Sequence, residues 1–187
     1  METPIAPLLK FETRVRGHLN AVGGYVSLLM LRLLLGYEYF TSGLTKFNGR
    51  NWFGSVEFPF PFSVLPVELN WFLATWFELV GAALLIIGLA TRYVAASLIV
   101  ITVVAIYAAH LPEVAEVIDG ERVWRTVGIG SIGEFFDGYR ISERCADGYC
   151  TGNYKLPVIY LFMFVPLLLS GGGRLAADRW LGKRLGK

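Results

Sequence analysis

Two charged residues lie in the middle of apolar stretches that are each long enough to cross a bilayer. Arg32 lies within residues 22–47, and Glu78 lies within residues 67–90. A charged side chain at that depth costs about 2.5–3.5 kcal/mol on the insertion scale, so it persists only where it is paired or functional. These two side chains are therefore the first candidates for binding a polar group or moving protons inside the membrane.

The positions of Arg32 and Glu78 along their helices predict that they lie at one depth. Each lies about ten residues from the inner end of its stretch, or about 15 Å at a rise of 1.5 Å per residue. If the two helices are antiparallel neighbours, the guanidinium and the carboxylate meet. We expect either a buried ion pair that pins the helices together or a polar pocket, such as a quinone head-group or proton site.

A second polar group is expected nearer the outer end of the same helices. Glu38 is followed at helical spacing by hydroxyl residues, and His110 ends the third apolar stretch. Lys46 and Asn70 are expected at this level too, so the four side chains can share an outer pocket. A histidine near a carboxylate there is a natural proton relay. The simpler interpretation pairs Glu38 with Lys46 and leaves His110 at the membrane interface.

The two cysteines, Cys145 and Cys150, lie between the third and fourth apolar stretches. Their C-x4-C spacing differs from the C-x-x-C of thioredoxin-like redox motifs and from zinc knuckles. A structural disulfide is the first expectation. A redox-active disulfide that passes electrons towards a quinone is the second, and metal binding with His110 or Asp147 is the last. We assign no metal site.

The composition predicts an integral membrane protein, because 55% of the residues are hydrophobic and the mean hydropathy is +0.52. A spanning helix needs about 17–25 residues, and uninterrupted apolar runs are typical of helices rather than of barrel strands. We expect one all-α domain over residues 1–187, built as a four-helix bundle. The predicted helices cover residues 22–47, 67–90, 93–111 and 155–171.

The distribution of lysine and arginine predicts the orientation. Basic residues gather in the N-terminal segment, in the connection at Arg92 and in the C-terminal tail. These regions share one side, which the positive-inside rule places in the cytoplasm. The 44-residue segment 111–154 carries twice as many acidic as basic residues and belongs outside. Both termini are therefore expected inside, with a long extracytoplasmic loop between the third and fourth helices.

Three further segments are expected at the membrane surfaces. Residues 7–20 have apolar residues at helical spacing between basic ones, which predicts an interfacial amphipathic helix or, alternatively, a disordered basic tail. Residues 174–186 suggest a second interfacial helix. The loop 48–66 alternates Phe and Pro, so we expect it to fold back as an aromatic lid or a structural plug over the bundle.

Three motifs together resemble those of the DoxX-like membrane proteins. They are Arg32-x3-Gly36-x3-Phe40-x2-Gly43-x2-Lys46-Phe47, Glu78-Leu79-Val80-Gly81-x6-Gly88-Leu89-Ala90-Thr91-Arg92 and Gly171-Gly172-Gly173-Arg174-Leu175-x2-Asp178. The resemblance implies a four-helix bundle in the bacterial cytoplasmic (inner) membrane. It also implies kinship with the DoxD subunit of thiosulfate:quinone oxidoreductase and with membrane partners of thiol and sulfur redox systems. The long segment 111–154 departs from the common pattern.

Three functions remain open at this point. The first is a membrane subunit of a quinone-linked thiol or sulfur redox system, in which Cys145 and Cys150 relay electrons and quinone is the cofactor. Its polar site would comprise Arg32, Glu38, Glu78 and His110. The second is a non-catalytic subunit that anchors a periplasmic or membrane partner, and the third is a small transporter. Besides the bilayer we expect a protein partner or a homo-oligomer. The net charge of +2 reflects the basic ends and indicates no nucleic-acid binding.

Overall fold

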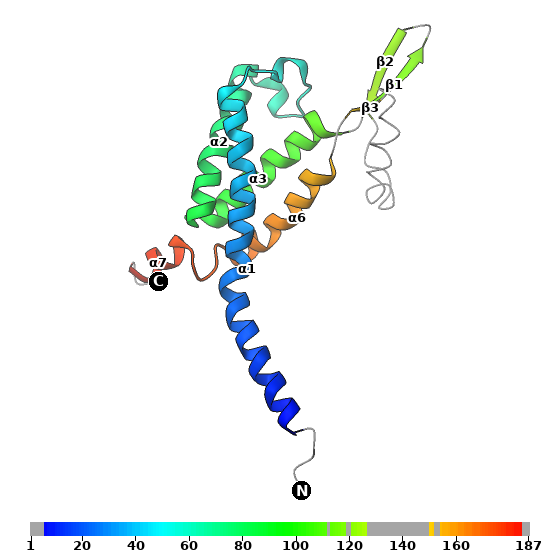
Figure 1. Ribbon diagram of the computed structural model, residues 1–187. Helices are drawn as coiled ribbons and strands as arrows, with labels where there is room; N and C mark the ends of the chain where they lie inside the picture. The colour runs from blue at the N-terminus through cyan, green and yellow to red at the C-terminus, as the bar shows by residue number, and fades with distance from the viewer. Residues whose placement is uncertain (1–5, 112, 119–120, 127–149, 152–153, 185–187) are drawn as a thin grey trace.

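The computed structural model describes residues 6–111, 113–118, 121–126, 150–151 and 154–184. Eight helical segments and three short strands follow one another along the described part of the chain (Figure 1). The helices are α1 (Ala6–Asn48), α2 (Val67–Ile87), α3 (Thr91–Ala105), α6 (Lys155–Ser170) and α7 (Ala177–Arg184), with the 3-10 helices η1 (Phe53–Ser55) and η2 (Phe62–Val64) and the π-helix η3 (Ile106–His110). The strands are β1 (Glu113–Ile118), β2 (Glu121–Thr126) and β3 (Cys150–Thr151).

Helices α1, α2, α3 and α6 pack around one apolar core. Helix α1 contacts α2 and α6, and α3 contacts the same two helices. Leu35, Leu85, Leu98, Phe164 and Leu167 are fully buried at the centre. Three segments are long and apolar enough to cross a membrane, and α6 is a shorter apolar helix. The three candidate spans are Phe11–Asn48, Val67–Ile87 and Thr91–His110.

Glycines bring α1 and α2 into close contact and set their register. A Cβ at Gly36 would lie 2.5 Å from Cγ1 of Ile86, and one at Gly43 would lie 2.8 Å from Cγ of Leu79. Small residues let transmembrane backbones approach in this way. This register places the α1 residues near 36 beside the C-terminal end of α2, which decides where Arg32 lies.

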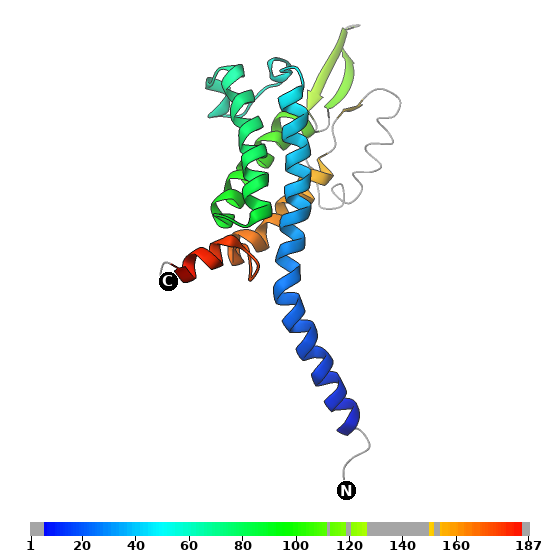
Figure 2. The ribbon, with the colours of Figure 1, turned by 60° about the vertical axis from the view of Figure 1, so that its left-hand side comes forward.

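The N-terminal segment differs from the expected separate interfacial helix over residues 7–20. It is the first part of α1, which runs without a break for 43 residues and projects beyond the bundle (Figures 1 and 2). The physical reason is the lack of a helix breaker, since no proline occurs between Pro7 and Pro59. The side chains from Phe11 to Tyr25 are exposed.

The segment after α3 is not purely a loop, so the all-α prediction holds for the membrane part alone. Strand β1 pairs antiparallel with β2 and with β3, in the order β2-β1-β3. Valines are enriched in the paired stretches, as is typical of strands, and an Asp-Gly dipeptide, typical of tight hairpins, separates β1 from β2 in the sequence. These sequence features could have predicted the hairpin.

Candidate functional site

A cavity of about 480 Å³ lies at the end of the bundle that carries the loop after α1, between α1, α2, α3, the start of α6 and this loop. Most of its wall is apolar. Its polar groups come mainly from one face of α1 and from the N-terminal half of α2. They include Glu38, Tyr39, Ser42, Lys46, Asn70, Glu78, Thr102, His110 and Tyr160. An apolar cavity with a few convergent polar groups is the usual form of a small-molecule site.

The loop after α1 covers this cavity with aromatic rings. Phe53 in η1 is only 7% exposed, and its ring centroid lies 5.0 Å from those of both Phe58 and Trp71. The side-chain amide of Asn70 donates a hydrogen bond of 2.9 Å to the carbonyl of Phe62, which ties η2 to α2. The Phe–Pro segment is therefore a fixed cover that lines the cavity, consistent with the lid or plug expected from the sequence.

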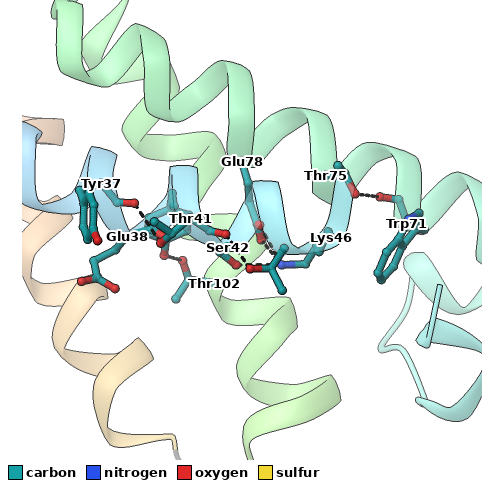
Figure 3. Close-up of polar contacts among 11 residues, drawn as sticks. Tyr37, Glu38, Thr41, Ser42, Lys46, Trp71, Thr75, Glu78 and Thr102 are labelled. Atoms are coloured by element: carbon teal, nitrogen blue, oxygen red, sulfur yellow. Dashed lines mark hydrogen bonds and ion pairs between the residues drawn. The ribbon is translucent and has the colours of Figure 1, made fainter. Parts of the chain in front are cut away.

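Glu78 pairs with Lys46 and not with Arg32, which corrects the expected ion pair. The Nζ atom of Lys46 donates to the two carboxylate oxygens of Glu78 at 2.8 and 3.0 Å (Figure 3). It also donates to Oγ of Ser42 at 2.9 Å, so all three ammonium hydrogens have acceptors. The alternative pairing of Glu38 with Lys46 is also wrong for the same reason.

Arg32 is fully buried near the opposite end of the bundle. A Cβ at Gly88 would lie 1.8 Å from its Nη1 atom, and its Nη2 atom donates to the carbonyl of Leu175 at 3.3 Å. Glu78 precedes Gly88 by about ten residues, or about 15 Å along α2. Arg32 and Glu78 do not meet because the α1–α2 register is shifted and because an arginine side chain in a helix points back towards the N-terminus.

Asp178 provides an opposite charge that acts on Arg32, and it joins three elements at this end of the bundle. Its two carboxylate oxygens accept hydrogen bonds of 2.6 and 2.9 Å from the backbone amides of Ala90 and Thr91, at the start of α3. Its own amide donates to the carbonyl of Gly88 at 3.0 Å. Arg32 and Asp178 attract each other electrostatically. The two residues therefore hold α1, the α2–α3 connection and the C-terminal segment together.

The four residues expected in one outer pocket, Glu38, Lys46, Asn70 and His110, all line the cavity. Asn70 is 5% exposed, and its Oδ1 atom has no hydrogen-bond partner within the described ranges. Glu38 interacts electrostatically with Tyr160 of α6 and forms no ion pair with any described residue. The cavity thus offers two oxygen acceptors, on Asn70 and Glu38, that a bound molecule with donor groups can use.

The hydrogen bond between the hydroxyl groups of Tyr39 and Thr102 on the cavity wall was not predicted from the sequence. Thr102 donates to the carbonyl of Leu98 at 2.6 Å, so its oxygen is left to accept the hydrogen of the Tyr39 hydroxyl. Tyr39 packs edge-on against Phe164 with the centroids 5.3 Å apart. A tyrosine and a threonine inside apolar helices were the available signal, since a buried hydroxyl needs a partner.

The cysteine prediction falls largely outside the described residues. Cys145 lies there entirely, and Cys150 is described only as the backbone of β3, so the Cys145–Cys150 disulfide stays a prediction. Among the residues that the structure describes, no group of three His, Cys, Asp or Glu side chains could hold a metal ion.

Two comparisons with known proteins agree with this architecture. The model of the DoxX family matches residues 27–111, which include α2, α3 and the bundled part of α1. A protein of Haemophilus influenzae (strain ATCC 51907 / DSM 11121 / KW20 / Rd), described as uncharacterized, is 35% identical over 167 residues, which are 88% of this chain and 89% of the relative. No solved structure matches this chain. The chain is therefore a membrane protein that belongs to the DoxX family.

Proposed function

We propose that this protein is the membrane subunit of a quinone-linked thiol or sulfur redox system and that the outer cavity holds the quinone. The observation that carries the proposal is the Oδ1 atom of Asn70, which has no hydrogen-bond partner among the described residues and lies in a mostly apolar, aromatic-covered cavity. A buried acceptor without a partner costs about 1–3 kcal/mol, and a hydroxyl of a bound quinol removes that cost. The cavity volume of about 480 Å³ suits a quinone ring with the start of its tail.

The polar wall gives the remaining groups their roles. Glu38 has no cationic partner among the described residues. It donates a proton to the quinone when the quinol forms and accepts a proton when the quinol is oxidised. The Lys46–Glu78 ion pair lies in the cavity wall beside the quinone ring and carries no net charge. In the reaction two thiols become a disulfide and the quinone becomes a quinol, so two electrons and two protons are transferred. Cys145 and Cys150 would relay the electrons from outside.

The proposed topology has four membrane crossings, with both termini in the cytoplasm of a bacterial cell and the cavity facing outwards. Helix α6 makes the fourth crossing with the residues that flank it. Residues 1–187 act as a single domain. The basic N-terminal segment and tail support this orientation, and so does the acidic excess of residues 111–154.

Quinone retention by a cavity-filling variant tests the proposal. Ala74→Phe places a ring in the cavity without touching any charge, whereas Ala96 is exposed on α3 and does not line it. We expect quinone to co-purify with the detergent-solubilised wild type and with Ala96→Phe, and to fall to background in Ala74→Phe. Absorbance and mass spectrometry of the extracted lipids measure it. A wild-type protein that neither retains quinone nor binds added quinone would sink the proposal.

A membrane anchor for a partner protein is the second candidate, and the three-stranded sheet favours it. The order β2-β1-β3 leaves an edge of β2 without a neighbour among the described strands, and a sheet edge can accept a strand of another chain. The double variant Cys145→Ser/Cys150→Ser separates the two functions. Redox activity disappears in the folded variant if the chain is a redox subunit, whereas only stability changes if it is an anchor.

A further inference from the structure

A second hollow, of about 560 Å³, lies at the end of the bundle opposite to the first cavity, between the start of α3 and the segment that joins α6 to α7. Figure 2 shows α7 at this end of the bundle. Arg92, Arg174 and Arg179 line it, together with the backbone of the glycines 171–173. We propose that this hollow binds the phosphate group of an anionic phospholipid. The inference is independent of the proposed redox function.

The three arginines carry charge that the described residues do not neutralise. Among the described residues, Asp178 is the only acidic one that lines the hollow, and both of its oxygens accept backbone hydrogen bonds at the start of α3. The buried Arg32 also counters its charge. None of the arginines of the hollow lies within salt-bridge distance of a described carboxylate. An anion that enters the hollow therefore meets a net positive surface.

Two of the guanidinium groups are already held in place. Arg92 donates from Nη2 to the carbonyl of Leu169 at 3.0 Å, and its Nε atom would lie 3.5 Å from a Cβ at Gly171. The Cζ atom of Arg174 lies 4.9 Å above the ring centroid of Tyr25. Because these groups are positioned before binding, they lose little freedom when they bind phosphate, and guanidinium is the cation best suited to phosphate oxygens.

The surroundings of the hollow favour a lipid phosphate over a soluble one. Tyr93 lines the hollow and is 80% exposed, and Leu175 and Trp180 nearby are 53% and 57% exposed. Exposed aromatic residues beside arginines are typical of the headgroup level of a membrane. A lipid can place its phosphate among the arginines and lay its acyl chains along these apolar side chains.

Native mass spectrometry of the full-length protein in detergent tests the proposal, with phosphatidylglycerol titrated against phosphatidylcholine. The variant Arg174→Gln/Arg179→Gln removes two charges and leaves the Arg92 hydrogen bond intact. Arg14→Gln/Arg16→Gln is the matched control, because it removes two charges from the projecting part of α1. We expect one saturable phosphatidylglycerol per chain, with affinity about thirtyfold lower in the first variant and unchanged in the control.

Three results would overturn the proposal. One is equal binding of phosphatidylglycerol and phosphatidylcholine by the wild type, and another is an equal loss of affinity in the two variants. The third is displacement of the bound lipid by millimolar inorganic phosphate, which would make the hollow a site for soluble anions. If the double variant fails to fold, as judged by circular dichroism, Arg179→Gln alone replaces it, since the Arg179 side chain is exposed and forms no ion pair with a described residue. We expect about a fivefold loss from that single change.

Discussion

The ammonium group of Lys46 finds all three of its acceptors inside the bundle, two on Glu78 and one on Ser42. The exposed fractions of the Lys46 and Glu78 side chains are 15% and 6%, so water contributes little to the solvation of these two charges. A buried pair of this kind is costly to break, because the remaining charge has no partner. The pair therefore fixes the outer halves of α1 and α2 relative to each other.

A double-mutant cycle measures how much the Lys46–Glu78 pair contributes to the stability of the bundle. We expect Lys46→Met and Glu78→Leu each to lower the free energy of unfolding by about 3–5 kcal/mol, because each leaves one buried charge unpaired. The combined variant should lose clearly less than the sum, since it leaves no charge behind. Denaturant unfolding in micelles, followed by circular dichroism, gives the three values. Additive losses would show that the two side chains do not stabilise the bundle as a pair.

At the scale of the elements, the contact between α1 and α2 depends on two glycines. A Cβ at Gly43 would meet not only the side chain of Leu79 but also its backbone nitrogen, at 3.1 Å. The backbone cannot yield as a side chain can. The spacing of Gly36 and Gly43 thus sets how deep Lys46 lies against Glu78 and where Arg32 lies.

Alanine substitutions at two glycines of α1 test this contact. Gly43→Ala should destabilise the protein by about 1–3 kcal/mol, because the helices must separate. The control is Gly17→Ala in the projecting part of the same helix, where nothing lies within 4 Å of the added methyl group. The control should be neutral or stabilising by about 0.5–1 kcal/mol, since alanine favours helix. Equal effects at the two positions would contradict the assigned contact.

The sequence predicts the helices and the residues that line the outer cavity better than it predicts which charged side chains pair with each other. The helices follow from the apolar runs, so Glu38, Lys46 and His110 could be expected in one pocket, and all three line the cavity. The partner of Glu78 could not be predicted, because the register of α1 on α2 comes from glycine contacts across the interface. Helix α1 continues beyond the bundle, so the sequence does not show where the first membrane span begins. The depth of Arg32 relative to Glu78 therefore could not be predicted.

At the scale of the whole molecule, charge is distributed between the two ends of the bundle. One end carries the arginines of the hollow and of α7, whereas the segment 111–154, to which the strands belong, has an acidic excess. Helix α1 is about 65 Å long at 1.5 Å per residue, roughly twice the hydrocarbon thickness of a bilayer. Its basic first part therefore extends beyond the hydrocarbon region on the same side as α7 (Figure 1).

Reporter fusions test the orientation that this distribution predicts. Alkaline phosphatase fused after Lys187 should be inactive and green fluorescent protein at the same place should fluoresce, because the basic side stays in the cytoplasm. Alkaline phosphatase inserted within residues 127–149 should be active. Immunoblots of each fusion control for expression. Active phosphatase at the C-terminus would reverse the proposed topology.

The Lys46–Glu78 pair also has an electrical consequence. A lone charge that crosses the membrane field changes in energy by about 2.3 kcal/mol per 100 mV. With ammonium and carboxylate 2.8 Å apart, the two contributions cancel almost completely and only a short dipole remains. The transmembrane voltage therefore exerts almost no net force on this part of the cavity wall, so its geometry stays the same in energised and de-energised cells.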